Sequence, residues 1–372
     1  MSTSSARDLL LGIKSWVEIE SHTADLDGVT RLMNHAATEY AAAGALVERI
    51  PGRDDRGDHL SIRSPWGGAG PGVLVLCHLD TVHPRGTLML CPFRVEGDRA
   101  FGPGIYDMKG GAYLALAAFR EISASGRSTP LPLHFLYVSD EEVGSPTSRA
   151  LIEQAAKAAR YVLVTEPCRD GGKVVTARKG VGRYMIRAEG RPAHSGSRHE
   201  DGRSAILEIA QNVVDIEGMT DYARGITFNI GQIRGGTADN TVPQFCEASV
   251  DVRVRTLTDG LVIEQALKAR KPYNPDVRLE ITGQVNRPPY EKNAGVVRLF
   301  QHAKEVAADI GIALEDTSTG GGSDGNFTAP TVPTLDGLGV DGAGAHTLDE
   351  HLLVSSLVPR MTLQKRLFET LS

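Results

Sequence analysis

The sequence predicts an α/β protein whose sheet contains parallel strands, with a smaller α+β unit inserted into it. The run at residues 72–77 is continuously apolar, and residues 133–138 and 161–164 largely repeat this character, which is typical of strands covered on both faces. Helical patterns lie between them, at about residues 109–125 and 147–160. Strands and helices that alternate in this way favour a sheet with parallel neighbours.

The inserted unit is predicted from a change of pattern after about residue 177. Apolar and polar residues alternate through residues 249–255, which indicates strands with one covered face and one wet face. Amphipathic helices are expected near residues 203–216 and 259–270. Apolar strands and helices of the first kind resume after residue 294. The predicted division is therefore a first domain of residues 1–178 and 288–372, and an inserted domain of residues 179–287.

Charge and composition exclude several classes of protein. The 372 residues carry a net charge of −6, which gives no reason to expect a nucleic-acid partner. No stretch approaches the roughly 18 apolar residues of a membrane span, so we expect no membrane partner. The four cysteines are scattered, which argues against a zinc finger or a disulfide scaffold. We expect a cytoplasmic protein with reduced thiols.

Several residues with metal-binding side chains follow predicted strands or lie in glycine-rich loops. His78 and Asp80 follow the strand at 72–77 and, one residue apart in an extended segment, point to the same side. A carboxylate beside a metal-bound histidine commonly orients its ring. Asp107 lies in a glycine-rich turn, Glu166 follows the strand that ends near residue 165, and His346 lies in a glycine-rich loop. Each residue alone has an ordinary structural explanation, such as a helix cap or a loop histidine.

Glu141 and Glu142 form an adjacent acidic pair after the strand at 133–138. Neighbouring side chains in an extended segment diverge, so we expect the two glutamates to have different roles. Two carboxylates side by side are costly unless cations or a shared proton relieve their repulsion. One would bind metal and the other would face the substrate as a base. Together with His78, Asp107, Glu166 and His346, the pair indicates a two-metal amide hydrolase.

Seven segments of the chain match one known family. They are HLDTV from His78, GPGIYDMKGG from Gly102, SDEEVGS from Ser139, TEP from Thr165, GRPAHSG from Gly190, GGGSDG from Gly320, and the segment around His346. By these segments the chain resembles the metallopeptidase family of bacterial glutamate carboxypeptidases, acetylornithine and succinyl-diaminopimelate deacylases, and tripeptidases. The resemblance covers nearly the whole chain and is strongest to the glutamate carboxypeptidase (carboxypeptidase G) type. It implies a zinc-exopeptidase-like mixed sheet flanked by helices, and an inserted domain that serves as lid and dimerisation domain.

The resemblance also implies a role for each matching residue. One zinc ion would be held by His78 and Glu166 and a second by Glu142 and His346, with Asp107 bridging them; cobalt or manganese are possible substitutes. Glu141 would be the general base and Asp80 the orienting partner of His78. His194 would stabilise the developing oxyanion in the neighbouring subunit of a homodimer. Substrate-binding positions would include Arg253, Asn240, Lys173 and Gly321, while His83 and Arg85 would line the mouth of the site.

These roles predict the hydrolysis of N-acyl amino acids or dipeptides with a free C-terminal carboxylate, which Arg253 would bind through two parallel hydrogen bonds. The alternatives are an N-acetyl or N-succinyl amino-acid deacylase, an aminopeptidase-type enzyme, or a non-catalytic metal-binding protein. Glu141 argues against the last, because a binding protein needs no base. A dinucleotide-binding enzyme is disfavoured because the glycine clusters lack the required spacing.

Overall fold

The computed structural model describes residues 4–68 and 70–372. The chain divides into two compact units, each with its own apolar core. Unit 1 comprises Met1–Ala177, Lys292–Thr319 and Ser323–Ser372, and unit 2 comprises Arg178–Glu291 and Gly320–Gly322. The predicted α/β class is confirmed by the mixed sheet and flanking helices of unit 1. The lid and dimerisation roles stay predictions.

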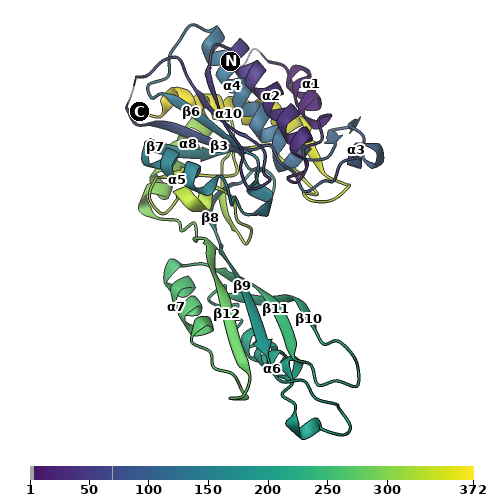
Figure 1. The fold of residues 1–372 in the computed structure, drawn as a ribbon. Helices are drawn as coiled ribbons and strands as arrows, with labels where there is room; N and C mark the ends of the chain where they lie inside the picture. Colours follow the sequence, from purple (N-terminus) through teal and green to yellow (C-terminus); the bar gives the residue numbers. More distant parts are fainter. Residues whose placement is uncertain (1–3, 69) are drawn as a thin grey trace. The chain divides into compact units, whose positions relative to one another are not determined.

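The main sheet of unit 1 has six strands. They span Leu46–Ile50 (β1), His59–Arg63 (β2), Gly72–His78 (β3), Leu133–Val138 (β6), Ala159–Val164 (β7) and Thr334–Leu335 (β14). Their order is β1-β2-β6-β3-β7-β14 (Figure 1). The four strands from β6 to β14 are parallel, whereas β1 and β2 are antiparallel to their neighbours. The carboxyl ends of β3 and β7 therefore meet at one edge of the sheet.

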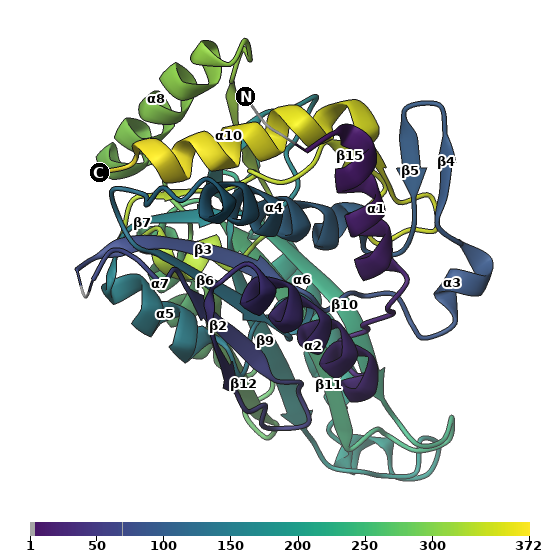
Figure 2. The ribbon, with the colours of Figure 1, turned by 90° about the horizontal axis from the view of Figure 1, so that it is seen from above.

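Helices cover both faces of this sheet. Alternate residues of β3 enter two different cores: Val73 and Val75 face one, and Leu74 and Leu76 face the other. This is why the strand is apolar up to Cys77, the residue before His78. Figure 1 shows α1, α2 and α4 on one face and α5 on the other, and Figure 2 shows α10 beside α4. The long helices span Ala6–Val17 (α1), Leu26–Ala42 (α2), Gly110–Ala124 (α4), Arg149–Lys157 (α5), Ala294–Asp309 (α8) and Leu357–Thr370 (α10).

A second, small sheet of unit 1 joins distant parts of the chain. Its strands are Arg94–Glu96 (β4), Arg99–Phe101 (β5), Gly342–Ala343 (β15) and His351–Leu353 (β16), in the order β15-β16-β5-β4. Because β16 pairs with β5, the loop that follows β5 lies beside the loop between β15 and β16. The shorter elements of unit 1 are Thr87–Leu90 (α3), Ile105–Lys109 (η1), Glu141–Val143 (η2), Val174–Arg178 (β8, which extends into unit 2), Asp316–Thr319 (β13), Gly325–Thr328 (α9) and Val354–Ser356 (η4).

Unit 2 is a four-stranded antiparallel sheet with two helices. Its strands span Gly180–Glu189 (β9), Thr227–Gly235 (β10), Phe245–Val254 (β11) and Arg278–Arg287 (β12), in the order β10-β11-β9-β12. The helices Ala205–Glu217 (α6) and Leu257–Lys268 (α7) share one core with the sheet. Alternate residues of β11 are buried, as the sequence predicted for a sheet with one wet face. His199–Asp201 (η3) is a short turn before α6.

Within the described part of the chain, none of the helices combines the length and the apolar character needed to cross a bilayer.

A partly buried histidine of the main sheet predicts how stability depends on pH. Burial lowers the pKa of His134 from 6.5 to about 4, and the charge of Arg63 adds to the effect. Between these two pH values the unfolded chain binds a proton that the folded chain does not, so stability falls as pH falls from 6.5 to 4. The loss is up to about 3 kcal/mol, from about 1.4 kcal/mol per pKa unit.

His134→Gln should make this pH dependence shallower, because an amide can still hydrogen-bond Ser61 as His134 does but does not titrate. Denaturant unfolding between pH 4 and 7, followed by the fluorescence of Trp16 and Trp66 in unit 1, measures the slope. The exposed His199→Gln is the matched control. Equal slopes in His134→Gln and the unmodified protein would contradict the prediction.

Candidate metal centre

His78, the last residue of β3, presents one ring nitrogen to two carboxylates. Its Nδ1 donates to the backbone carbonyl of Asp80 at 3.0 Å, so Nε2 carries the lone pair. This Nε2 lies 3.3 Å from Oδ1 of Asp107 and 3.6 Å from Oε1 of Glu166. Among the described residues it is buried and has no hydrogen-bond partner. Such a nitrogen is suited to bind a metal ion.

Asp107 lies between two groups of potential ligands. Its Oδ1 faces His78, and its Oδ2 lies 3.5 Å from Nε2 of His346. The first group consists of His78, Asp107 and Glu166, and the second of Asp107, Glu142 and His346; within each group the ligand atoms lie within 4.8 Å of one another. Asp107 is not a helix cap, because α4 begins at Gly110 and Lys109 directly precedes it. The two groups thus share one carboxylate.

The second group forms between the turn η2 and the loop that carries His346. Nε2 of His346 lies 3.2 Å from Oε2 of Glu142. The other oxygen of Glu142 is buried and, within the described residues, accepts no hydrogen bond. His346 has a positive φ of 66°, in a loop that begins and ends on the small sheet. That sheet brings His346 to Asp107 from a distant part of the sequence.

Asp80 connects His78 to the acidic pair. Its buried carboxylate accepts from the backbone N–H groups of Glu141 and Glu142, each at 3.2 Å, and from the hydroxyl of Thr23 at 2.7 Å. The expectation that the acidic pair lies in an extended segment was wrong, because residues 141–143 form a 3₁₀ turn that these hydrogen bonds anchor. The turn still separates the pair: within the described chain, Glu142 belongs to a ligand group and Glu141 to neither.

The electrostatic environment also favours a bound cation. Burial raises the pKa of Glu142, with repulsion by Asp107 adding to it, while contact with His346 opposes the rise. Contacts with Asp107 and then Glu142 raise the pKa of His346 to about 10. The negative charges of Asp107 and Glu142 therefore stabilise a positive charge beside them, which can be a proton on His346 or a metal ion. Imidazole and carboxylate ligands are those that zinc binds, so the residues fit such an ion.

The other predicted residues belong to neither ligand group of the described chain. Lys173 forms a 3.1 Å ion pair with Glu315 on the surface of unit 1. In unit 2, the segments of His194 and Asn240 are neighbours, because the N–H of Ser195 donates to the carbonyl of Asn240 at 3.0 Å.

The side chains of two predicted residues in unit 2 already have partners. Nδ1 of His194 accepts from the N–H groups of Gly196 and Ser197, at 3.1 and 3.2 Å, which leaves the ring proton on Nε2. The guanidinium group of Arg253 donates two hydrogen bonds to the carboxylate of Asp251, from Nε to Oδ1 at 2.6 Å and from Nη2 to Oδ2 at 3.1 Å. For Gly321 the contact is through the backbone, since its carbonyl accepts from Nη1 of Arg178 at 3.4 Å.

Sequence reasoning missed two buried carboxylates near the ligand groups. Asp140 accepts four hydrogen bonds from the backbone and hydroxyl groups of Thr147 and Ser148, and so closes the segment that follows the acidic pair. Glu350 accepts from the loop of Asp107 and from His83. His83 is thus buried, not at the mouth of a site as expected. An acidic residue four positions after His346 was the available signal for Glu350.

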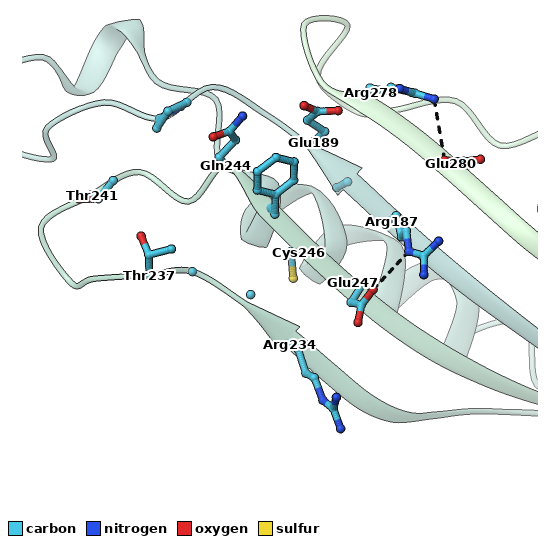
Figure 3. A pocket seen from close by; sticks show the side chains of 15 residues that line it. Arg187, Glu189, Arg234, Thr237, Thr241, Gln244, Cys246, Glu247, Arg278 and Glu280 are labelled. Atoms are coloured by element: carbon cyan, nitrogen blue, oxygen red, sulfur yellow. Dashed lines mark hydrogen bonds and ion pairs between the residues drawn. The ribbon is translucent and has the colours of Figure 1, made fainter.

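A hollow of about 610 Å³ lies in unit 2, on the strands that carry Arg187, Glu247 and Glu280 (Figure 3). Two ion pairs line it, Arg187 with Glu247 at 3.2 Å and Arg278 with Glu280 at 3.9 Å. The ligand groups do not line it. Its lining carries equal numbers of arginines and glutamates, so its net charge favours neither anions nor cations.

An α/β sheet with imidazole and carboxylate groups gathered around one shared aspartate defines the class of metal-dependent hydrolases. The profile described as Peptidase family M20/M25/M40 matches residues 74–370. The chain therefore belongs to this family, and it is a metal-dependent hydrolase of amide bonds.

Curated relatives and solved structures agree with this assignment. The chain is 30% identical to carboxypeptidase G2 of Pseudomonas sp. (strain RS-16), over 94% of this chain and 85% of that protein. It is 25% identical to succinyl-diaminopimelate desuccinylase of Paracidovorax citrulli (strain AAC00-1), over 90% of this chain and 91% of that protein. Aminopeptidase PepT from Bacillus cereus ATCC 10987 is similar in fold, with a TM-score of 0.74 at 21% identity and 98% coverage of both chains.

The shared carboxylate predicts how metal binding responds to substitution. Asp107→Asn should weaken binding in both groups by at least about 100-fold, or about 2.7 kcal/mol, because it removes a charge from each. Glu166→Gln should weaken only the first group, since Glu166 belongs to that group alone. Metal analysis after equilibrium dialysis measures both effects.

The exposed Asp309→Asn is the control for loss of one surface carboxylate. If Asp107→Asn retained as much metal as Asp309→Asn at every free metal concentration, Asp107 would not be a shared ligand.

Proposed function

We propose that the protein binds two zinc ions and hydrolyses the amide bond of N-acyl amino acids or dipeptides with a free C-terminal carboxylate. The observation that carries the proposal is the pair of ligand groups that share Asp107, with Glu141 beside them on the turn of Glu142. One ion would be held by His78, Asp107 and Glu166, and the other by Asp107, Glu142 and His346. When bound, such ions lower the pKa of water and polarise a carbonyl group.

Glu141 would supply the proton transfers of the reaction. The neighbouring Glu142 would bind metal, and Asp80 accepts from the backbone N–H groups of both glutamates, so one turn holds the main chain of the pair. A carboxylate oxygen of Glu141 would take a proton from the attacking water and give it to the departing amine. His194 would donate from Nε2 to the developing oxyanion in the neighbouring subunit of a homodimer, since its Nδ1 already accepts two backbone hydrogen bonds.

Arg253 would bind the C-terminal carboxylate of the substrate. Its hydrogen bonds to Asp251 have the two-point geometry in which a guanidinium binds any carboxylate. The residue lies on the partly exposed face of β11. A substrate carboxylate would therefore displace Asp251 from the guanidinium group or bind to that group beside it. Asn240, next to the His194 segment, Lys173 and Gly321 complete the proposed substrate-binding set.

An N-succinyl or N-acetyl amino-acid deacylase is the second candidate. The 25% identity to a succinyl-diaminopimelate desuccinylase favours it. Both candidates retain Arg253 as the carboxylate-binding group and differ in the acyl group. Hydrolysis rates for benzoyl-, succinyl- and acetyl-glutamate and for a free-amine dipeptide separate the two candidates from an aminopeptidase.

We further propose a homodimer formed through unit 2. β10 is an edge strand of its sheet, and an edge offers free backbone groups to a second chain. Exposed apolar residues lie on this strand and on α6, among them Ile233, Leu207 and Val214. Apolar side chains beside a free edge fit a self-complementary interface. Sedimentation equilibrium tests this state.

The role of Glu141 predicts a separation between metal binding and activity. Glu141→Gln should lower kcat by about 10²–10⁴-fold, because the amide cannot accept the proton. Its metal content should equal that of the unmodified protein, because Glu141 belongs to neither ligand group of the described chain. Steady-state kinetics and metal analysis of the same samples provide the two measurements.

Glu153→Gln, on the exposed side of α5, is the control. Unchanged turnover in Glu141→Gln would contradict its role as base, whatever the metal content.

The role of Arg253 predicts an effect on KM. Arg253→Lys should raise KM for an N-acyl glutamate at least about 10-fold, because lysine cannot form two parallel hydrogen bonds. The same substrate with its α-carboxylate converted to an amide should show no such difference between the two proteins. Initial rates over a range of substrate concentrations measure both.

Arg187→Lys is the matched control, since Arg187 also lies on a strand of unit 2 and pairs with a carboxylate, Glu247. An equal KM for the N-acyl glutamate in Arg253→Lys and Arg187→Lys would exclude Arg253 as the carboxylate-binding residue.

A further inference from the structure

Glu350 is a buried acidic residue that belongs to neither ligand group. It directly precedes β16 and follows His346 by four residues. Its side chain is only 1% exposed. A buried carboxylate is costly unless several donors satisfy it, so its partners indicate what the position is for.

Four donors surround the carboxylate of Glu350. Oε1 accepts from the backbone N–H groups of Tyr106 and Asp107, each at 2.9 Å. Oε2 accepts from the N–H of Gly104 at 2.9 Å and from Nε2 of His83 at 2.6 Å. Each oxygen thus receives two hydrogen bonds, which satisfies its two lone pairs.

Three of these donors belong to the turn that presents Asp107. The backbone of Asp107 departs from helical geometry inside this turn, with φ −117° and ψ 96°, so the surrounding helical hydrogen bonds do not fix its position. The N–H of Asp107 is instead held by Glu350. The pairing of β5 with β16 places Glu350 beside the turn, where the N–H of Gly102 donates to its carbonyl at 3.3 Å.

The fourth donor connects Glu350 to the segment that follows β3. His83 lies five residues after His78 and donates to Glu350 from Nε2. Glu350 therefore contacts the segment of Asp107 directly, the segment of His78 through His83, and shares a loop with His346. These three ligands come from both groups.

We propose that Glu350 is a positioning residue, which holds the main chain of Asp107 so that one carboxylate faces both ligand groups. The inference rests on the metal binding of the proposed function and adds a residue that acts on it through Asp107. Glutamine cannot replace Glu350, because its amide nitrogen would place N–H donors against the N–H of Gly104 or those of Tyr106 and Asp107. Aspartate is one methylene too short to reach them.

The experiment compares Glu350→Gln with Glu121→Gln, a second buried glutamate of unit 1, which pairs with Lys365. Co²⁺ is titrated into each metal-free protein, and the visible absorption of the bound Co²⁺ reports the geometry of its ligands. Glu350→Gln should bind Co²⁺ about 10–100-fold more weakly and with an altered spectrum, as expected when a group that orients a ligand is lost. Glu121→Gln should match the unmodified protein in both.

Thermal unfolding of the metal-free proteins separates positioning from simple stabilisation. A residue that only stabilises the fold would lower the melting temperature of Glu350→Gln and leave its Co²⁺ affinity and spectrum unchanged, which would overturn the inference. An unmodified protein that binds no divalent metal would overturn the proposed function and, with it, this inference.

His83 provides a second test that leaves Glu350 in place. His83→Gln keeps an N–H donor near the position of Nε2, and His83→Leu removes it. Co²⁺ affinity should fall several-fold in His83→Leu and return to near the unmodified value in His83→Gln. Equal affinities in the two variants would overturn the link through His83, and this pair decides the matter if Glu350→Gln does not fold.

Discussion

The gathering of carboxylates around Asp107 is the constraint on which the rest of unit 1 depends. Asp107, Glu142 and Glu166 lie close together and mostly buried, and Asp80 lies behind them. Such an arrangement is unstable unless positive charge enters it or each oxygen has a fixed donor. The proposed metal ions would supply that charge, with the neutral imidazoles of His78 and His346 as further ligands. The backbone N–H groups of Glu141 and Glu142 supply donors for Asp80. These hydrogen bonds join the turn η2 to the segment that follows β3.

The sequence predicted the fold class and the residues of the ligand groups because these leave local signals. A strand buried on both faces is apolar, as β3 is up to Cys77, and ligands that follow parallel strands meet at one edge of the sheet. His78 and Glu166 fit this rule, since β3 and β7 are parallel neighbours. The roles expected of residues such as His194 and Arg253 came from the family resemblance, because no local sequence pattern assigns them.

The sequence could not predict contacts that depend on register and on turn geometry. Three of the four donors of Glu350 are backbone groups 243 to 246 residues away, and the pairing of β5 with β16 brings them to it. The carboxylate of Asp80 lies 3.5 Å from Nδ1 of His78, and its role in orienting the ring stays a prediction. The sequence did not reveal that the backbone carbonyl of Asp80 accepts from Nδ1, or that the carboxylate also anchors the acidic turn. Backbone hydrogen bonds have no side-chain signature, so sequence patterns do not reveal them.

The division of unit 1 by the insertion of unit 2 also affects the order in which the protein can assemble during synthesis. Four of the five residues of the ligand groups precede residue 178, whereas His346 follows the whole of unit 2. The core of unit 1 likewise includes residues of α8 and α10, which are translated after unit 2's continuous segment Arg178–Glu291. Unit 2 contains all strands of its own sheet within one continuous segment, so it can fold while unit 1 is still incomplete. On the ribosome, the first ligand group is therefore complete before unit 2 is made, whereas the second group must wait for His346.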